Sequence, residues 1–448
     1  MSPLLEYDVV LNEFFRQPAM RRAALSTQAG YAQNLAAFLS FLWSARDGRS
    51  WRDASEDDHL AYLWWRRRDP AGPRVAGATW DREVAAVNRF YRWAVRSGQV
   101  AQSPVPQEMR RSIGPSGWGS RRLWDEERPA TYAHDSVRDR VQWLPPESYR
   151  RWRDTGVRGF TATGLPRDGF RGRWSGRNAS FCDLMVRTGL RLAEQAALTV
   201  FEVPPASDGG YARFWLPEAV AKGRSARWVY VPTSVSRDLG AYRGWDREPV
   251  VEDARAAGRY AAWRHPWVVA DPVRAEARRA GSTDQVPVAR LEPADRRRLL
   301  VDGPDGLSPA AFWLGENGQP LSVSAWKAVF ADANRRCAEA GLGLRCHPHL
   351  LRHTFAVVTL EQLQRGHLAA LAEQDPRQRE YYTRIFGDPL DWVRRRLGHA
   401  SVVTTQIYLH ALAELEMETR MGLVPDGWED PPANEPDLEI HGTPGSAS

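Results

Sequence analysis

The chain has 448 residues, of which 43% are apolar and 26% charged, a composition typical of a globular protein of about two or three domains. A mean hydropathy of −0.52 and the lack of any apolar run of about 18 residues exclude a membrane-spanning chain. Three scattered cysteines exclude a disulfide framework and a four-ligand zinc site, and they fit a reducing cytoplasm. The net charge of +6 indicates a polyanionic partner such as DNA, RNA or a membrane surface.

Residues 1–105 predict a small, basic, helical domain. Ser55 and Asp58 form a capping box at the start of one helix, and Gly98 ends the last one. Apolar residues recur at helical spacing, as in Tyr31, Leu35, Phe38, Leu39 and Leu42 and in Trp80, Val84, Val87 and Tyr91. Residues 106–140 are rich in Gly, Arg and Ser and predict a linker.

The remainder of the chain predicts mixed helices and strands. A helix around 176–188 ends at Thr188-Gly189, and strands at 211–216 and 226–232 form a hairpin. The stretch 233–305 gives no clear element. The further predicted elements are a strand and turn at 312–319, a helix from Ser322 or Ser324 to about Ala340, and helices over roughly 349–372, 376–398, 402–408 and 409–422. The tail 425–448 has six acids and no Lys or Arg, and predicts disorder.

Four separated segments carry residues suited to phosphate chemistry: TGLRLAEQAALT (188–199), AKGRSARWVYVP (221–232), HPHLLRHTFA (347–356) and LGHASVVTTQIYLH (397–410). They resemble the motifs of the tyrosine recombinase (phage integrase) family and occur in the family's order. Residue by residue, the resemblance implies a catalytic set with one supporting acid. The catalytic residues are Arg191, Lys222, His349, Arg352, His399 and Tyr408, and the supporting acid is Glu194.

The resemblance also implies the fold class, which is mainly α with a small β-sheet (α+β). The expected domains are a helical core-binding (SAM-like) DNA-binding domain at 1–105, a linker at 106–140, a catalytic domain at 141–424 and an acidic disordered tail at 425–448. Compared with the family, the catalytic domain holds inserts near 233–305 and 362–390.

Elementary chemistry supports the same roles. Breaking a phosphodiester requires neutralising charge on a pentacoordinate phosphate, which Arg191 and Arg352 can do with paired donors and His399 can assist. A tyrosine becomes a covalent nucleophile when a neighbour takes its proton, and His349 is the base expected for Tyr408.

The leaving 5′-oxygen needs a proton in return. All but two basic residues are arginine, so Lys222 is informative, because lysine can release a proton where arginine stays charged. Glu194, one helical turn beyond Arg191, is expected to orient an arginine or histidine rather than react.

Simpler interpretations exist for each residue taken alone. A single TGLR segment is usually a helix end with a surface arginine, Lys222 could be a solvated hairpin tip, and Tyr408 a half-buried packing residue. Tyr381 and Tyr382 are rival nucleophiles. A structural zinc is a further alternative for the histidines, but no HExxH or CxxC motif accompanies them. His353 and His410 are expected to make only local hydrogen bonds.

The resemblance therefore implies a site-specific DNA recombinase that cuts and rejoins duplex DNA through a 3′-phosphotyrosyl intermediate without metal, cofactor or ATP. We expect a cytoplasmic bacterial integrase of a mobile element that forms a homotetramer on two DNA sites. An accessory DNA-bending or excision factor could assist it, and no membrane partner is expected. The alternatives are a housekeeping dimer resolvase with the same chemistry, or a non-catalytic DNA-binding protein on an integrase scaffold, which would bind with strong salt dependence and form no covalent adduct.

Overall fold

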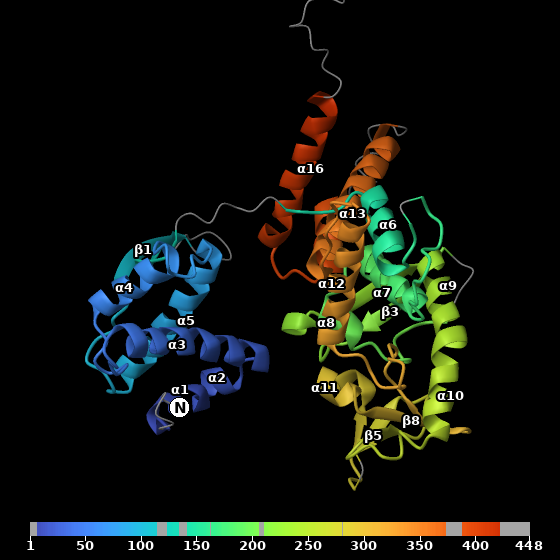
Figure 1. Ribbon diagram of the computed structural model, residues 1–448, viewed down its shortest axis with the longest axis horizontal. Helices are drawn as coiled ribbons and strands as arrows, with labels where there is room; N and C mark the ends of the chain where they lie inside the picture. Colours follow the sequence, from blue (N-terminus) through green and yellow to red (C-terminus); the bar gives the residue numbers. More distant parts are fainter. Residues whose placement is uncertain are drawn as a thin grey trace, which may run out of the picture. The chain divides into compact units, whose positions relative to one another are not determined.

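The computed structural model describes residues 7–113, 123–133, 141–161, 163–205, 210–279, 281–372 and 388–421. The chain divides into two compact units, Met1–Asp139 and Arg140–Ser448 (Figure 1). Within the described ranges, no helix is long and apolar enough to cross a membrane.

The first unit is a helical bundle around aromatic side chains. Its helices are α1 (Val9–Arg16), α2 (Pro18–Arg21), α3 (Leu25–Ala45), α4 (Glu56–Arg67) and α5 (Gly77–Arg96). The predicted capping box is confirmed at the start of α4, where the Ser55 hydroxyl accepts from the Asp58 N–H and the Asp58 carboxylate accepts from the Ser55 N–H. The fully buried aromatic side chains of the bundle include Phe14, Phe38, Trp80, Phe90 and Tyr91.

A two-stranded antiparallel sheet follows this bundle, formed by β1 (Gln107–Ile113) and β2 (Leu123–Pro129). The prediction of a linker over 106–140 is therefore wrong where the chain forms β1 and β2. The sequences QEMRRSI and LWDEERP carry charged residues at odd and at even positions alike, so neither shows the apolar alternation that identifies a half-buried strand. The chain then returns to the bundle, where the Trp80 indole N–H donates to the Thr131 carbonyl.

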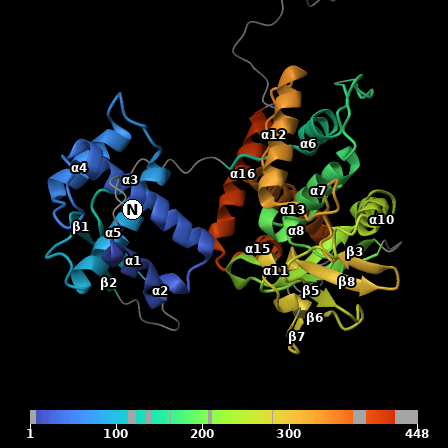
Figure 2. The ribbon, with the colours of Figure 1, turned by 60° about the horizontal axis from the view of Figure 1, so that its bottom comes forward.

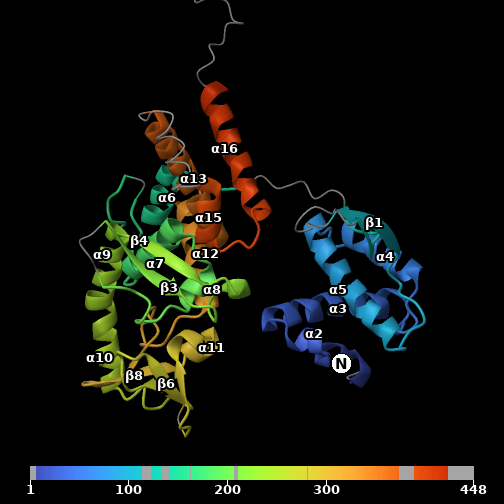
Figure 3. The ribbon, with the colours of Figure 1, turned by 180° about the vertical axis from the view of Figure 1, so that it is seen from behind.

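The second unit is built around α7 (Ser175–Thr188), which packs against α13 (Pro348–Ala372) (Figures 1 and 3). Phe181 of α7 stacks on Trp326 of α12 (Val323–Glu339) with ring centroids 3.6 Å apart. The surrounding elements are α6 (Pro146–Trp152), the π-helical turn η1 (Arg153–Val157), α8 (Leu192–Ala196), β3 (Tyr211–Leu216), β4 (Arg227–Pro232), α9 (Thr233–Ala241), α15 (Pro389–Leu397) and α16 (Val403–Met421).

Most elements predicted for this unit are confirmed, including the β3–β4 hairpin and the Ser322 cap of α12, whose hydroxyl accepts from the Ala325 N–H. The two helices predicted at 402–408 and 409–422 are wrong as separate elements, because α16 is continuous and no Gly or Pro interrupts its sequence. Of the helix predicted at 376–398, Pro389–Leu397 is helical. Residues 373–387, with Tyr381, Tyr382 and most of the expected 362–390 insert, and the tail 425–448 lie outside the described residues.

The stretch 233–305 contributes four strands, and the residues just after it a fifth, to a sheet with the order β7-β6-β5-β8-β9 (Figure 2). After α9 come the π-helical turn η3 (Tyr242–Arg247) and α10 (Glu248–Ala256), and then β5 (Trp267–Val269), β6 (Glu276–Arg279), β7 (Gln285–Pro287), η4 (Val288–Arg290), α11 (Pro293–Arg296), β8 (Leu299–Gly303) and β9 (Gly306–Pro309). Within this sheet β5 and β8 pair in parallel, and the other neighbouring strands pair antiparallel. Arg296 is buried here against Glu202 at 2.8 Å.

Candidate active site

The first predicted segment places Arg191 directly after a sharp chain reversal. Helix α7 ends at Gly189, which adopts φ +66°, and Arg191 caps the N-terminus of α8. A Cβ atom on Gly189 would lie 2.4 Å from Cδ1 of Phe355. Glycine is needed at 189 both for its conformation and for the close approach of α13, so the predicted Thr188-Gly189 helix end is confirmed.

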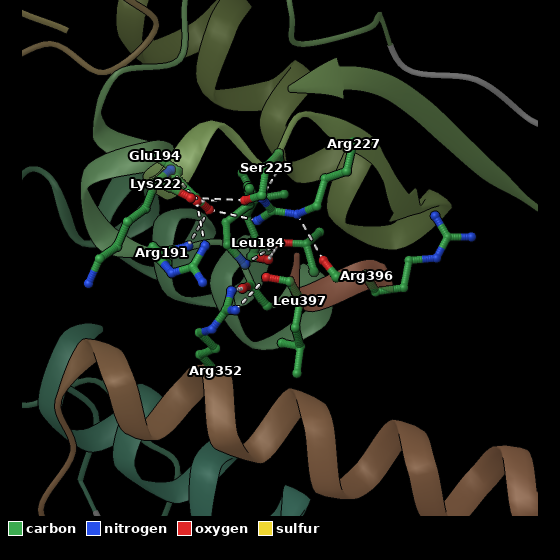
Figure 4. Close-up of polar contacts among 12 residues, drawn as sticks. Leu184, Arg191, Glu194, Lys222, Ser225, Arg227, Arg352, Arg396 and Leu397 are labelled. Carbon is green, nitrogen blue, oxygen red and sulfur yellow. Dashed lines mark hydrogen bonds and ion pairs between the residues drawn. The ribbon is translucent and has the colours of Figure 1, made fainter. Parts of the chain in front are cut away.

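Glu194 links the first segment to the second (Figure 4). Its carboxylate accepts from the Arg191 backbone N–H at 3.0 Å and from Arg191 Nη1 at 2.8 Å. It also accepts from Arg227 Nη2 at 2.6 Å and from the Lys222 backbone N–H at 3.3 Å. Burial by itself raises the pKa of Glu194, but the charge and hydrogen bonds of Arg227, together with Arg191, lower that pKa to about 2. Glu194 is therefore ionised at neutral pH, and its carboxylate orients Arg191.

Lys222 lies at the tip of the β3–β4 hairpin, in the short helical turn η2 (Lys222–Arg224). The turn depends on two residues with positive φ, Gly223 at 67° and Arg224 at 57°. The Lys222 side chain is exposed and extends away from Glu194 (Figure 4). Burial lowers the pKa of His349, and the charges of Arg352, Arg191 and Lys222 add to that shift.

Arg352 is the buried centre of the site, with 1% of its surface exposed. Its two Nη atoms donate to the Gly189 carbonyl and to the Leu397 carbonyl (Figure 4). Burial and the charge of Arg191 lower the pKa of Arg352 to about 9, so the guanidinium stays charged at neutral pH. Each Nη carries a second hydrogen that these two carbonyls do not use.

Tyr408 lies on α16 with its hydroxyl 3.0 Å from Nδ1 of His353 and only 1% of its surface exposed. Burial raises the pKa of Tyr408, while the charges of Arg352 and Arg191 oppose that shift. The His399 ring lies nearly parallel to the phenol, at 12° and 6.4 Å between centroids, and its Nδ1 is 3.0 Å from the Thr405 hydroxyl.

The histidines differ in their relation to Tyr408. His353 contacts the hydroxyl from 55 positions away, so the prediction that it makes only local hydrogen bonds is wrong. His349 is exposed on the first turn of α13, and its ring lies 4.3 Å from that of His353. Burial and nearby charges lower the pKa of His353 and of His399 to about 4, so both rings are neutral at pH 7. His410 is exposed.

The predicted residues thus come together from four separate segments of one unit. Arg191, Arg352 and Lys222 supply positive charge, and the hydroxyl of the Tyr408 phenol contacts a neutral imidazole. This arrangement fits attack of a tyrosine on a phosphodiester. Among the described residues, no three His, Cys, Asp or Glu side chains group as a metal site would require.

Sequence reasoning missed two residues of this site, Arg227 and His353. The signal for Arg227 was its place on a strand beside apolar neighbours, where a charged residue needs a buried partner. The signal for His353 was its position one residue after Arg352, but a contact with Tyr408 depends on how α13 and α16 pack.

Comparison with known proteins finds similarity to integrases and recombinases. The profile described as "Phage integrase, N-terminal SAM-like domain" matches residues 11–98. Over 392 residues the chain is 24% identical to the tyrosine recombinase XerC of Roseiflexus sp. (strain RS-1), which covers 87% of this chain and 85% of that protein. The chain belongs to the tyrosine recombinase family. A shorter stretch of 147 residues is 35% identical to the tyrosine recombinase XerD of Mycobacterium tuberculosis, covering 31% of this chain and 38% of that one.

Solved recombinase structures resemble the chain more loosely. The Tn1549 transposon integrase in complex with a circular intermediate DNA gives a TM-score of 0.49 at 11% identity, covering 91% of this chain and 99% of that one. The XerH site-specific recombinase bound to a palindromic difH substrate gives 0.47 at 15% identity, covering 90% and 82%. Family membership, with the mainly helical units and small sheets, confirms the predicted fold class and the enzyme class of tyrosine-type recombinases.

Proposed function

We propose that this tyrosine-type recombinase cuts and rejoins duplex DNA through Tyr408. The observation that carries the proposal is the contact of the Tyr408 hydroxyl with His353, the residue after Arg352, at 3.0 Å. A buried phenol whose hydroxyl contacts a neutral imidazole is poorly explained as packing alone, since an apolar side chain would fill that space without a polar partner.

The proposed cleavage step transfers the scissile phosphate from the 5′-oxygen of DNA to Tyr408. The Tyr408 oxygen forms a bond to the scissile phosphorus and gives its proton to a histidine, and the bond from phosphorus to the 5′-oxygen breaks. Arg191, Arg352 and His399 stabilise charge on the non-bridging oxygens. The structure favours His353 as the first acceptor of the proton, with His349 beside it.

Lys222 is the proposed donor to the leaving 5′-oxygen, which departs as a hydroxyl. Religation reverses these transfers, with the 5′-hydroxyl of a partner strand attacking the phosphotyrosyl bond. The bond energy is kept in that linkage, so the proposed reaction consumes no ATP and needs only protein side chains. Because Tyr408 is almost fully buried, attack also requires the start of α16 to move when DNA binds.

The biological role we propose is integration and excision of a mobile element by a homotetramer on two DNA sites. The matched profile carries the description of a phage integrase, which favours that role. The names XerC and XerD of the similar proteins favour a second candidate, a housekeeping resolvase of DNA dimers.

Recombination between paired plasmid sites separates the two roles. One plasmid pair carries the sequences flanking the gene, and the other carries the dimer-resolution site of the same genome, each with and without host extract. Joined products only from the flanking sequences support the integrase. Products only from the dimer-resolution site support the resolvase. Salt-sensitive binding without products from either pair, even with extract, supports the non-catalytic alternative.

A further inference from the structure

Arg227 is a buried arginine of β4 that none of the catalytic roles above uses. Its side chain is 6% exposed and points from the base of the β3–β4 hairpin toward Glu194 (Figure 4). A charge in such a place is costly unless its hydrogen-bonding groups are paired. Its partners therefore show what it holds in place.

Those partners belong to three different segments. Arg227 Nη2 donates to Glu194 at 2.6 Å, and Nη1 donates to the Ser225 carbonyl at 3.3 Å. Nε donates to the Arg396 carbonyl at 2.9 Å. The next carbonyl along α15, that of Leu397, accepts from Arg352. Two buried arginines thus bind adjacent carbonyls at the end of the helix that leads to His399.

The hairpin also rests closely on the turn that follows α15. A Cβ atom on Gly398 would lie 2.8 Å from the Ser225 hydroxyl and 3.1 Å from Arg227 Nη1. The hairpin that carries Lys222 is therefore seated directly on this turn. A shift of either element would break contacts on both.

We propose that Arg227 is the positioning residue of the Lys222 hairpin, which it fastens to Glu194 and to the end of α15. This inference rests on the proposed function, because it assigns Arg227 an effect on the proton delivered by Lys222. Only a guanidinium can donate in these three directions at once; a lysine would keep the charge beside Glu194 but lose the planar fork. Arg227→Lys is therefore expected to loosen the hairpin and slow cleavage by about 10- to 100-fold.

A substrate whose leaving atom needs no proton tests this role. Replacing the bridging 5′-oxygen at the scissile phosphate by sulfur gives a thiolate leaving group, which departs without a general acid. We expect cleavage by Arg227→Lys and by Lys222→Ala to recover at least tenfold relative to wild type on the sulfur substrate. Cleavage by Arg191→Ala, which lacks charge stabilisation, should not recover.

Controls make the result specific. Each variant is compared on both substrates from one preparation, so loss of folded protein cancels in the ratio. Arg247→Lys is a matched control, because Arg247 is likewise buried and bonds to the Pro309, Ala311 and Phe312 carbonyls away from the site; it should keep the wild-type ratio.

Two outcomes overturn the assignment: a defect of Arg227→Lys that persists on the sulfur substrate, and wild-type cleavage of the oxygen substrate by that variant. If wild type forms no adduct with either substrate, the proposed function itself fails and the inference fails with it.

Discussion

Replacing Glu194 by glutamine tests the electrostatic core of the site. The carboxylate is 1% exposed and lies 2.6 Å from Arg227 Nη2 and 2.8 Å from Arg191 Nη1. The amide keeps the shape but leaves Arg227, itself 6% exposed, without its counter-charge. Removing one partner of a buried ion pair typically costs about 3–5 kcal/mol.

The lowered pKa of Glu194 gives a similar free energy for the loss of this ion pair. A value of about 2 against the usual 4.5 corresponds to about 3 kcal/mol in favour of the folded, ionised state, at about 1.4 kcal/mol per pH unit. Because the folded pKa is the lower one, this stabilisation is complete above pH 4.5 and is lost as the pH falls toward 2. At pH 7 the variant should lose all of it.

Urea denaturation of the full chain at pH 7, followed by tryptophan fluorescence, measures the loss, and DNA cleavage measures its effect on the site. Glu202→Gln is the matched control, because Glu202 pairs with buried Arg296 at 2.8 Å outside the site. Both variants should lose stability, whereas only Glu194→Gln should lose cleavage per folded molecule. A Glu194→Gln protein within about 1 kcal/mol of wild type, with normal cleavage, would refute the reasoning.

Three further substitutions test separate contacts. Gly398→Ala places a methyl group 2.8 Å from the Ser225 hydroxyl at φ +65°, and should cost about 1–3 kcal/mol in urea denaturation and slow cleavage; an unchanged midpoint counts against close seating of the hairpin. His353→Phe removes the acceptor at Tyr408 and should slow single-turnover cleavage about 10²- to 10⁴-fold, more than His349→Phe does; the opposite order would reassign the base. Burial lowers the pKa of His59 from 6.5 to about 4, so the unfolded state binds a proton before the folded state does as the pH drops. The free energy of unfolding of the wild type should therefore fall as the pH drops from 6.5 to 4 in denaturant titrations, and His59→Gln should flatten that fall.

The features predicted from sequence are those set by local chemistry. The Ser55 capping box, the glycine end of α7 at Gly189 and the β3–β4 hairpin depend on residues within a few positions of one another. The catalytic candidates followed from the order of the motifs, and their catalytic roles stay predictions.

The features that were missed depend on distant partners. Arg227 pairs with Glu194 across 33 positions and His353 meets Tyr408 across 55, so neither contact leaves a local pattern. The five-stranded sheet was missed because its strands are only 3–5 residues long.

The central claim is that Tyr408 becomes joined to DNA, and a covalent adduct measures it most directly. Nicked, end-labelled duplexes from the gene's flanks are incubated in EDTA with wild-type protein and with Tyr408→Phe, and then run on denaturing gels. The account predicts label that migrates with the wild-type polypeptide and is lost in Tyr408→Phe. An adduct that persists in Tyr408→Phe would contradict it and move the nucleophile elsewhere, with Tyr381 and Tyr382 tested next.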